Sequence, residues 1–302
     1  MTRQTDAHSR WPPHLPPVRS LLFAPGGRPD MLAKAAGAGA DAVVMDLEDA
    51  VPEANKASAR QNVASALAGE WRSRSLAVVR INGVGSRHWQ ADLRAAAGKN
   101  LRAIMLPKCQ SPAEAVAAGR LLGRLEKARR LKRGSVKIFL LVETPLCLLR
   151  LEAILQATPR IVLLALGAED LALHTGLSRS PDDRELLVAR SWVGFAAAAY
   201  GCLAIDSVYM KYHDLPGLAR ESEQAKRMGY SGKLLVHPGQ IETTHSAFAP
   251  SAEDLARAAE IVRLAEEMNV RGAGAAGLKG ELVDRPVIER ARRILAANRA
   301  AG

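Results

Sequence analysis

The stretch VKIFLLVETPLCLLRLEAILQATPRIVLLALGAEDL, residues 136–171, decides the fold. It contains two apolar runs, IFLLVE and IVLLALG, with a helix-length segment between them. Continuous apolar strands that alternate with helices are typical of a parallel sheet that is buried on both faces. The carboxyl ends of such strands lie at one edge, and ligands bind there. The stretch therefore predicts one βαβ unit of a larger parallel sheet.

A carboxylate follows each of these two strands. Glu143 comes directly after the first apolar run, and Asp170 comes shortly after the second. Because the two residues are one βαβ unit apart, we expect both at the same edge of the sheet. Two hard anionic oxygens, with open positions left for water and substrate, suit Mg²⁺. The alternative is that Glu143 and Asp170 are ordinary acids of helix N-termini. Polar residues also follow the other strands, which favours the magnesium site.

Six further apolar runs precede or follow the central stretch. They are SLLFAP, AVVMDLEDAV, LAVVRIN, RAIMLPK, LAIDSVY and KLLVHP. Helices are expected between the runs, including residues 55–69, 89–97, 182–200 and 214–228. Eight strands that alternate with helices have the number and order of a (β/α)8 TIM barrel. A doubly wound sheet is the alternative. We expect the barrel to occupy residues 19–250.

The two ends of the chain differ from the barrel pattern. Residues 1–18 are polar and proline-rich, lack an apolar targeting segment, and are predicted to form a flexible arm. Residues 251–302 contain an amphipathic helix at 252–267, the glycine- and alanine-rich linker RGAGAAG, and a final segment with apolar spacing. Such a linker suggests a mobile lid or an arm that docks on a neighbouring subunit. We expect a homo-oligomer.

Composition limits the class of partner. The 302 residues carry a net charge of +11, which could indicate nucleic acid, an anionic surface or a phosphate-bearing substrate. Aromatic residues make up only 4%, which argues against a platform for stacking bases. A basic run at residues 119–137 ends a helix and enters a strand, so in a barrel it lies opposite the active site. We interpret it as a solvated surface and expect no nucleic-acid partner.

The three cysteines, Cys109, Cys147 and Cys202, form no CxxC pair. A disulfide framework or a structural zinc site is therefore not expected, and a reducing cytoplasm is the expected location. No segment approaches the length that spans a membrane, so no membrane partner is expected.

The predicted strand ends also carry candidates for chemistry. Glu48 and Asp49, together with Asp46, follow the second strand and could orient water around a metal ion. Arg80 ends the third strand and offers a planar fork to a carboxylate or a developing oxyanion. A metal beside an arginine suits cleavage or formation of a carbon–carbon bond in hydroxy or keto acids. The PGGRP turn, with Arg28 and Lys34, could receive phosphates of a large anionic substrate.

A series of ordered motifs resembles a known family. The motifs are RSLLFAPGGRPDMLAKA, AGADAVVMDLEDAV, VVRIN, LPK, VETPL, LGAEDLA, ELLVARS, IDSVY and GKLLVHPGQI. They resemble the citrate lyase β-subunit-like branch of the HpcH/HpaI aldolase family, the CoA-ester lyases, from Arg19 to about Arg293. The resemblance implies a Mg²⁺-dependent barrel that cleaves citryl-, malyl- or citramalyl-CoA-type thioesters or forms them in reverse. It also implies a trimer or a trimer-based assembly with the tail over the next subunit's site.

Carried over by position, the resemblance assigns roles to individual residues. Glu143 and Asp170 match the metal ligands, and Arg80 matches the arginine that meets the substrate oxyanion. Glu48 and Asp49 match the acidic pair near the metal's water molecules. The resemblance places Arg28 and Lys34 in the region that meets CoA.

Three features of the sequence depart from the family pattern. Lys279 stands where members with a lid often have an acid, His174 replaces an aspartate, and the residues after IDSVY are Met210, Lys211 and Tyr212. Thioester hydrolysis, which the resemblance ties to the lid acid, is therefore not expected. Lyase chemistry remains the expected activity. A class II aldolase that acts on free acids and a CoA-binding subunit without activity of its own are the alternatives.

Overall fold

The computed structural model describes residues 9–13, 15, 16, 18–69, 73–180, 182–271 and 274–301, with side chains described up to residue 296. The chain forms two compact units, Met1–His245 and Ser246–Gly302. We describe each unit by itself. The predicted division of the chain at residues 18 and 250 remains a prediction.

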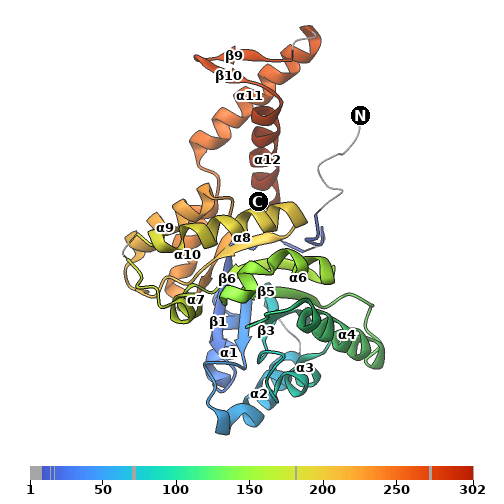
Figure 1. Ribbon diagram of the computed structural model, residues 1–302. Coiled ribbons are helices and arrows are strands. Elements are labelled where there is room, and N and C mark those ends of the chain that lie inside the picture. The colour runs from blue at the N-terminus through green and yellow to red at the C-terminus, as the bar shows by residue number, and fades with distance from the viewer. Residues whose placement is uncertain are drawn as a thin grey trace. The chain divides into compact units, whose positions relative to one another are not determined.

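Eight parallel strands of the first unit pair in chain order and close into a barrel (Figure 1). The strands are β1 (Ser20–Pro25), β2 (Ala42–Asp46), β3 (Leu76–Arg80), β4 (Leu101–Leu106), β5 (Lys137–Val142), β6 (Ile161–Leu166), β7 (Leu203–Asp206) and β8 (Gly232–Leu235). The pairing of Ser20 with Lys233 closes the barrel between β1 and β8. The predicted TIM barrel is confirmed, and the doubly wound sheet is wrong.

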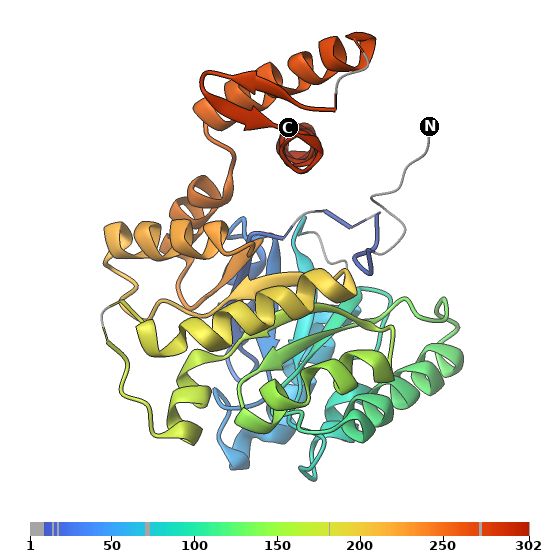
Figure 2. The same cartoon turned by 45° about the horizontal axis from the view of Figure 1, so that its top comes forward.

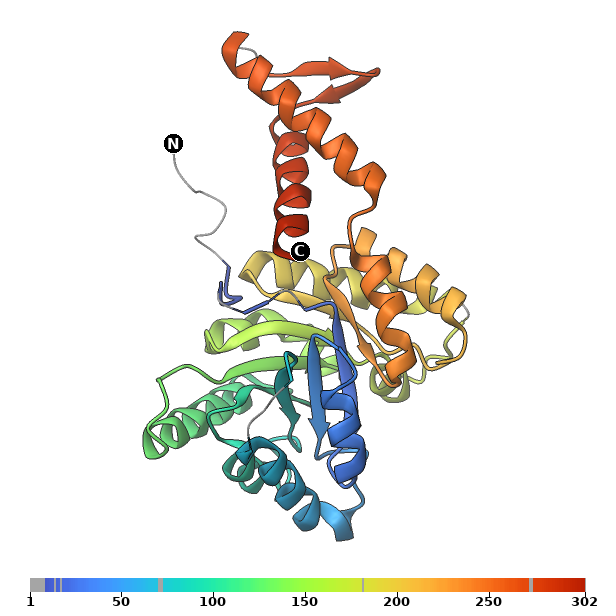
Figure 3. The same cartoon turned by 180° about the vertical axis from the view of Figure 1, so that it is seen from behind.

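Helices connect and surround these strands, and Figure 3 shows α1 and α2 outside the blue strands of the barrel. The helices are α1 (Pro29–Ala36), α2 (Lys56–Ala68), α3 (Trp89–Ala96), α4 (Pro112–Ala128), α5 (Pro145–Leu149), α6 (Leu151–Ala157), α7 (Ala168–Thr175), α8 (Leu187–Tyr200), α9 (Leu215–Arg227) and α10 (Ile241–Phe248). In the described part of the chain, no helix is long and apolar enough to cross a membrane.

One predicted helix starts later than expected. The helix predicted from residue 182 begins at Leu187, after the 3-10 turn η2 (Arg184–Leu186). Asp183 precedes that turn with φ of 51°, in the left-handed region. An α-helix of L-residues cannot pass through this conformation, so the helix starts after it.

The barrel interior is filled by apolar side chains from successive strands. Val44, Val78, Met105, Phe139 and Ile205 belong to one core cluster, and none is more than 1% exposed. This packing explains why the strands read as continuous apolar runs in the sequence.

Part of the predicted N-terminal arm contacts the barrel. The ring of Trp11 lies 6.0 Å from the ring of Phe139, and Arg10 Nη1 donates a hydrogen bond of 2.9 Å to the Leu155 carbonyl. Residues 1–8, 14 and 17 lie outside the described residues. The flexible arm therefore remains a prediction.

The second unit has a small core of its own. It contains α11 (Ala252–Arg271), the antiparallel hairpin of β9 (Ala276–Leu278) and β10 (Glu281–Val283), and α12 (Arg285–Ala301). Ile261 of α11 packs with Val283 and Ala291. Figure 2 shows α12 end-on while α11 lies across the view, so the two helices cross.

These contacts correct two expectations for the tail. The glycine- and alanine-rich linker does not continue through residue 277, because residues 276–278 form β9, which lies beside α11 (Figure 3). The apolar face of the final segment was expected to need a neighbouring subunit. Instead, it packs on α11 of the same chain.

Candidate active site

Arg80 is held rigidly at the carboxyl end of β3. Its register partner on β2 is Asp46, whose two carboxylate oxygens accept hydrogen bonds from Arg80 Nε at 2.7 Å and Nη2 at 2.6 Å. The guanidinium carbon also lies 5.0 Å from the centre of the Phe23 ring. Because a bidentate pair fixes the plane of the guanidinium, the remaining nitrogen, Nη1, has a defined direction.

The acidic pair predicted at this edge surrounds that nitrogen. Arg80 Nη1 lies 3.3 Å from Glu48 Oε2 and 3.8 Å from Asp49 Oδ2. Lys108 Nζ lies 2.9 Å from Glu48 and 3.0 Å from Asp49. Burial raises the pKa of Glu48 to about 7, although Arg80 and Lys108 act in the opposite direction. The structure therefore brings Arg80, Glu48 and Asp49 together as predicted.

Two residues that received no role from the sequence support the loop after β2. Lys56 Nζ donates hydrogen bonds to the Leu47 carbonyl at 2.8 Å, to the Glu48 carbonyl at 2.7 Å and to Asn82 Oδ1 at 2.8 Å. Asn82 Nδ2 in turn donates to the Leu47 carbonyl at 2.8 Å. Both side chains are buried. They fix the backbone that carries Glu48, and only the polar ending of the strand RIN hints at this role.

Glu143 is fully buried at the end of β5. Its Oε1 accepts a hydrogen bond of 2.7 Å from the backbone N–H of Lys108, and no described group partners its buried Oε2. Burial, followed by the negative charges of Glu48 and Asp170, raises the pKa of Glu143 to about 8. The charge of Asp170 is thus one cause of the raised pKa of Glu143, and the shared metal site of the two residues remains a prediction.

Gly167 allows the end of β6 to approach Glu143 closely. A Cβ atom at position 167 would lie 2.5 Å from the Glu143 Cβ, a distance that real Cβ atoms do not show. The Gly167 N–H also donates a hydrogen bond of 2.9 Å to the Val142 carbonyl. Asp170 follows in the first turn of α7 and is partly exposed. The GAED motif therefore begins with glycine because any larger residue would clash with Glu143.

The chemistry of these oxygens fits a divalent cation. An unpartnered buried carboxylate oxygen is costly unless a cation or a donor meets it. The negative charges that raise the pKa of Glu143 would be offset by such a cation. The described residues contain no group of three or more His, Cys, Asp or Glu side chains that could hold a metal. A two-carboxylate site leaves positions open, which matches the way Mg²⁺ keeps water.

The predicted CoA contacts are not assembled into a site. Arg28 precedes α1 and is exposed, and its guanidinium pairs with Asp30, 2.9 Å between Arg28 Nη2 and Asp30 Oδ2. Lys34 lies on α1 and is exposed. Both residues follow β1 at the same edge as Arg80, but they make no contact with the acidic pair that the structure describes.

The positions that depart from the family pattern have partners of their own. His174 Nδ1 lies 2.7 Å from the Asp170 carbonyl, and Lys279 Nζ donates a 2.9 Å hydrogen bond to Glu260. The ring of Tyr212 stacks on His237, with centres 5.0 Å apart. His174 therefore contacts the backbone of a predicted metal ligand.

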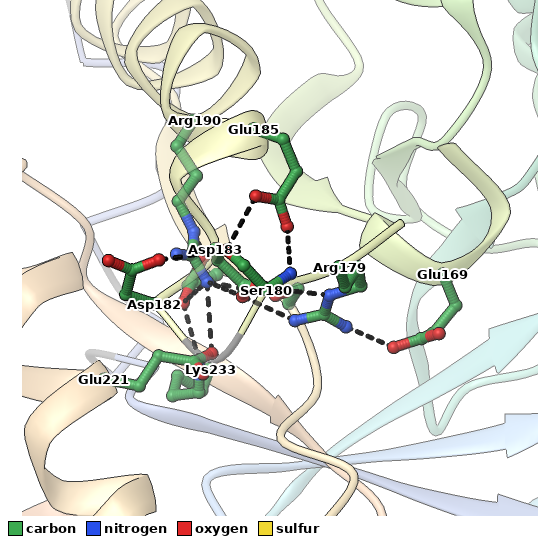
Figure 4. A network of polar contacts seen from close by, with 11 residues as sticks. Glu169, Arg179, Ser180, Asp182, Asp183, Glu185, Arg190, Glu221 and Lys233 are labelled. Atoms are coloured by element: carbon green, nitrogen blue, oxygen red, sulfur yellow. Dashed lines mark hydrogen bonds and ion pairs between the residues drawn. The ribbon is translucent and has the colours of Figure 1, made fainter. Parts of the chain in front are cut away.

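A buried ionic network lies on the α7–α8 side of the barrel (Figure 4). Arg190 is 2% exposed, and its Nε donates to Asp206 at 3.0 Å; Lys233 Nζ donates to the same carboxylate at 2.6 Å. Arg179 joins Asp183 to Glu169, the neighbour of Asp170. The network ties the first turn of α7 to β7 and β8. No sequence motif predicts this network, because its residues come from separate segments of the chain.

Fold and site together define a (β/α)8 barrel enzyme with an acidic, arginine-containing centre at the strand ends. The chain belongs to the HpcH/HpaI aldolase/citrate lyase family, which it matches over residues 19–238. The citrate lyase subunit beta of Haemophilus influenzae is 35% identical over 277 residues, covering 92% of this chain and 95% of the relative. A (3S)-malyl-CoA thioesterase of Cereibacter sphaeroides is 33% identical over 280 residues, covering 93% and 94%.

Solved structures give the same family. The CitE protein of Mycobacterium tuberculosis, in complex with magnesium, acetoacetate and coenzyme A, is similar with a TM-score of 0.78 and 33% identity, covering 93% of this chain and 98% of that chain. Another structure of that protein holds magnesium and pyruvate; its TM-score is 0.65 with 34% identity, covering 78% and 92%. The predicted family and enzyme class, a citrate lyase β-subunit-like lyase, are confirmed. The expected cofactor agrees with the magnesium of these relatives.

Proposed function

We propose that the chain is a Mg²⁺-dependent carbon–carbon lyase that cleaves a β-hydroxyacyl-CoA thioester of the citryl-, malyl- or citramalyl-CoA type. The products are a keto acid and an acyl-CoA. One observation carries the proposal: the buried, unpartnered Oε2 of Glu143 lies within the electrostatic reach of Asp170 and Glu48. A site of this kind suits a cation, and relatives with this fold hold magnesium and coenzyme A.

Glu143 and Asp170 would hold the ion, and Glu48 and Asp49 would accept hydrogen bonds from the water around it. When bound, Mg²⁺ supplies Lewis-acid stabilisation of negative charge on substrate oxygens. Lys108 neutralises part of the charge of the acidic pair, at 2.9 Å from Glu48 and 3.0 Å from Asp49. Its backbone N–H also fixes Glu143.

The cleavage breaks the bond between the hydroxyl-bearing carbon and the carbon next to the thioester. The hydroxyl oxygen loses its proton and becomes the keto oxygen, and the electron pair passes to the thioester side, which then takes up a proton. Arg80 stabilises the oxyanion through Nη1, because Asp46 occupies Nε and Nη2. Glu48, with its pKa raised to about 7, can hold or release a proton near neutral pH.

The phosphates of the CoA part of the substrate would contact Arg28 and Lys34. Arg28 would exchange Asp30 for a phosphate, which costs little because an exposed ion pair is weak. We further propose a cytoplasmic homo-oligomer, a trimer or a trimer-based assembly, in which the second unit of one chain covers the site of a neighbour. Lys279 would then meet phosphates or an acyl carboxylate as a cation.

Two other functions have specific support. Relatives of this chain bear the name citrate lyase subunit beta, so a CoA-binding subunit of a larger complex is one. A class II aldolase acting on free acids is the other, since a similar structure holds magnesium and pyruvate.

The deciding experiment is a panel of β-hydroxyacyl-CoA thioesters and the matching free acids, assayed with Mg²⁺ and with EDTA for keto-acid release. We expect release from at least one thioester, none from the free acids, and none with EDTA. Release from free acids alone supports the aldolase. No release from any substrate, with CoA still bound, supports the non-catalytic subunit.

A further inference from the structure

A cationic groove lies on the first unit, away from the candidate active site. It is a hollow of about 1020 Å³ between one face of α4 and the segment 157–160 that leads into β6, and α4 lies beside α6 (Figure 1). Six cationic side chains line it, and none of its described lining residues is acidic: Arg120, Arg124, Lys127, Arg133, Lys137 and Arg160. We call this hollow the α4 groove.

The α4 groove faces away from the predicted metal site. Lys137 begins β5 and Arg160 directly precedes β6, whereas Glu143 and Gly167 follow the same two strands. In a closed parallel barrel, the residues that precede strands and those that follow them lie at opposite ends. Ligands of the groove and of the active site therefore do not compete for the same residues.

Two glycines of α4 line the groove. Cβ atoms added at Gly119 and Gly123 would lie 3.5 Å from Thr158 Oγ1 and from Arg160 Nη2, respectively. Larger side chains at these positions would fill the space between helix and turn. Val116, Leu131 and Pro159 add apolar surface to the lining. The groove thus combines apolar and cationic lining residues.

The cations of α4 stand along one face of the helix without acidic partners. Arg120, Arg124 and Lys127 are spaced by four and three residues, are exposed, and form no ion pair within the described residues. Like charges at these spacings destabilise a helix by about 0.2–0.5 kcal/mol per pair. This arrangement is unfavourable for the isolated chain, and a bound anion would offset it.

The carboxylate next to the α4 groove, Glu126, already has partners of its own. Arg160 donates to both oxygens of Glu126, at 2.8 and 2.7 Å, and Glu126 also accepts from the backbone of Gly134 and Val136. Glu126 is 1% exposed and therefore cannot pair with the exposed cations of α4. Burial and the neighbouring charges of Arg160 and Lys132 lower the pKa of Lys137, although Glu126 acts in the opposite direction.

We propose that the α4 groove binds an acidic polypeptide segment of a partner protein, with its apolar side chains against the apolar lining residues and its carboxylates on the cationic ones. An oligophosphate has no apolar surface to place on Val116, Leu131 and Pro159. A single-stranded nucleic acid needs aromatic rings for stacking, and the lining residues of the groove include none. Arginine is the side chain best suited to carboxylates because its planar fork donates two parallel hydrogen bonds.

The test measures binding of a fluorescein-labelled 16-residue peptide of glutamate and leucine to the full-length chain by fluorescence anisotropy. The variant Arg120→Ala/Arg124→Ala/Lys127→Ala should weaken binding at least about tenfold, equivalent to about 1.4 kcal/mol. The control Arg227→Ala/Arg290→Ala/Arg293→Ala removes the same charge elsewhere and should change binding less than about twofold. Lyase activity should be unchanged in the first variant, since its three residues lie outside the catalytic machinery.

Competition separates the alternative occupants. Unlabelled peptide should displace the probe, whereas tripolyphosphate and a 16-base-pair DNA duplex should displace it only at much higher concentration. Equal loss in both triple variants, or no loss in the first, would overturn the proposal. Tighter binding of the duplex or of tripolyphosphate to the same three residues would also overturn it. If the triple variant fails to fold, Arg124→Glu alone must produce the same loss of peptide binding.

Discussion

Asp46 and Arg80 face each other as register partners on β2 and β3, and two hydrogen bonds of 2.7 and 2.6 Å join the carboxylate to the guanidinium. This pairing leaves Arg80 Nη1 directed at Glu48, 3.3 Å away. The orientation of the one nitrogen proposed to meet substrate is therefore set by a carboxylate that does not itself react.

Arg80→Lys should lower kcat/KM by about 30- to 1000-fold, or roughly 2–4 kcal/mol of transition-state stabilisation. Lysine keeps the charge but cannot bond Asp46 with two nitrogens and still present a third. Steady-state kinetics with the best thioester measure the effect on catalysis, and the thermal unfolding midpoint measures any effect on stability. Arg87→Lys, at an exposed pair with Glu53, is the control and should leave kinetics unchanged. Near wild-type efficiency of Arg80→Lys removes Arg80 from the mechanism.

Glu143→Gln and Asp170→Asn should each abolish measurable Mg²⁺ binding or weaken it at least about 100-fold. Each substitution removes one of only two protein carboxylates from an oxygen-ligand site. Isothermal titration with Mg²⁺, with Mn²⁺ as a second probe, measures this independently of activity. Glu169→Gln, next to Asp170 but paired with Arg179, is the control for a general loss of negative charge. Full affinity in both ligand variants refutes the assignment.

The strands and their order could be predicted because burial on both faces leaves a simple apolar signal. The pairing of Arg80 with Asp46 could not, because it depends on the register between β2 and β3. Lys108 was visible in the LPK motif, but its left-handed backbone, with φ of 50°, directs its N–H at Glu143 only in the fold. Such contacts depend on tertiary geometry and produce no periodic pattern in the sequence.

In the tail, by contrast, the sequence does contain a local signal for the hairpin of β9 and β10. Lys279 and Gly280 form a two-residue hairpin loop, with φ of 51° and 83°. Both central residues of a type I′ turn have positive φ, and glycine favours such a turn. The three-residue strands on either side are too short to show alternation, so the hairpin was interpreted as part of a lid segment.

Arg190→Ala should destabilise the first unit by about 3–5 kcal/mol, because it removes one of the two cations that contact each of the buried carboxylates of Asp206 and Asp183. Chemical denaturation measures the free energy of unfolding. Arg184→Ala removes an exposed arginine from the segment between α7 and α8 and should change the free energy of unfolding by less than about 1 kcal/mol. Equal effects of the two substitutions would show that the network in Figure 4 does not stabilise the barrel.

Acid should destabilise the barrel through Asp41. Burial would raise its pKa, but hydrogen bonds from His245 and Arg19 lower it to about 2. A folded-state pKa below the unfolded value of about 3.9 contributes stability above pH 4 that is lost as the pH falls towards 2. Allowing for solvent screening, we expect Asp41→Asn to cost about 1–2 kcal/mol at pH 7. The difference from wild type should shrink between pH 4 and 2, while Asp30→Asn, at an exposed ion pair that solvent screens, should show a much smaller change.

The second unit gives the final prediction, because its core lies within one chain while its proposed role lies on a neighbour. Truncation after Pro250 removes α11, the hairpin and α12 together, so no apolar face of α11 is left without its partner. We expect weaker assembly in light scattering and a raised KM for the CoA thioester. Truncation after Asn269 should add aggregation, because it exposes Ile261, which packs against Val283 and Ala291.

Lys279→Ala should raise KM without dissociating the assembly, and Lys279→Arg should return KM to the wild-type value. Glu260→Ala, which removes the acceptor of the 2.9 Å hydrogen bond from Lys279, should not raise KM. A monomer truncated after Pro250 with wild-type KM and kcat would show that each barrel works alone.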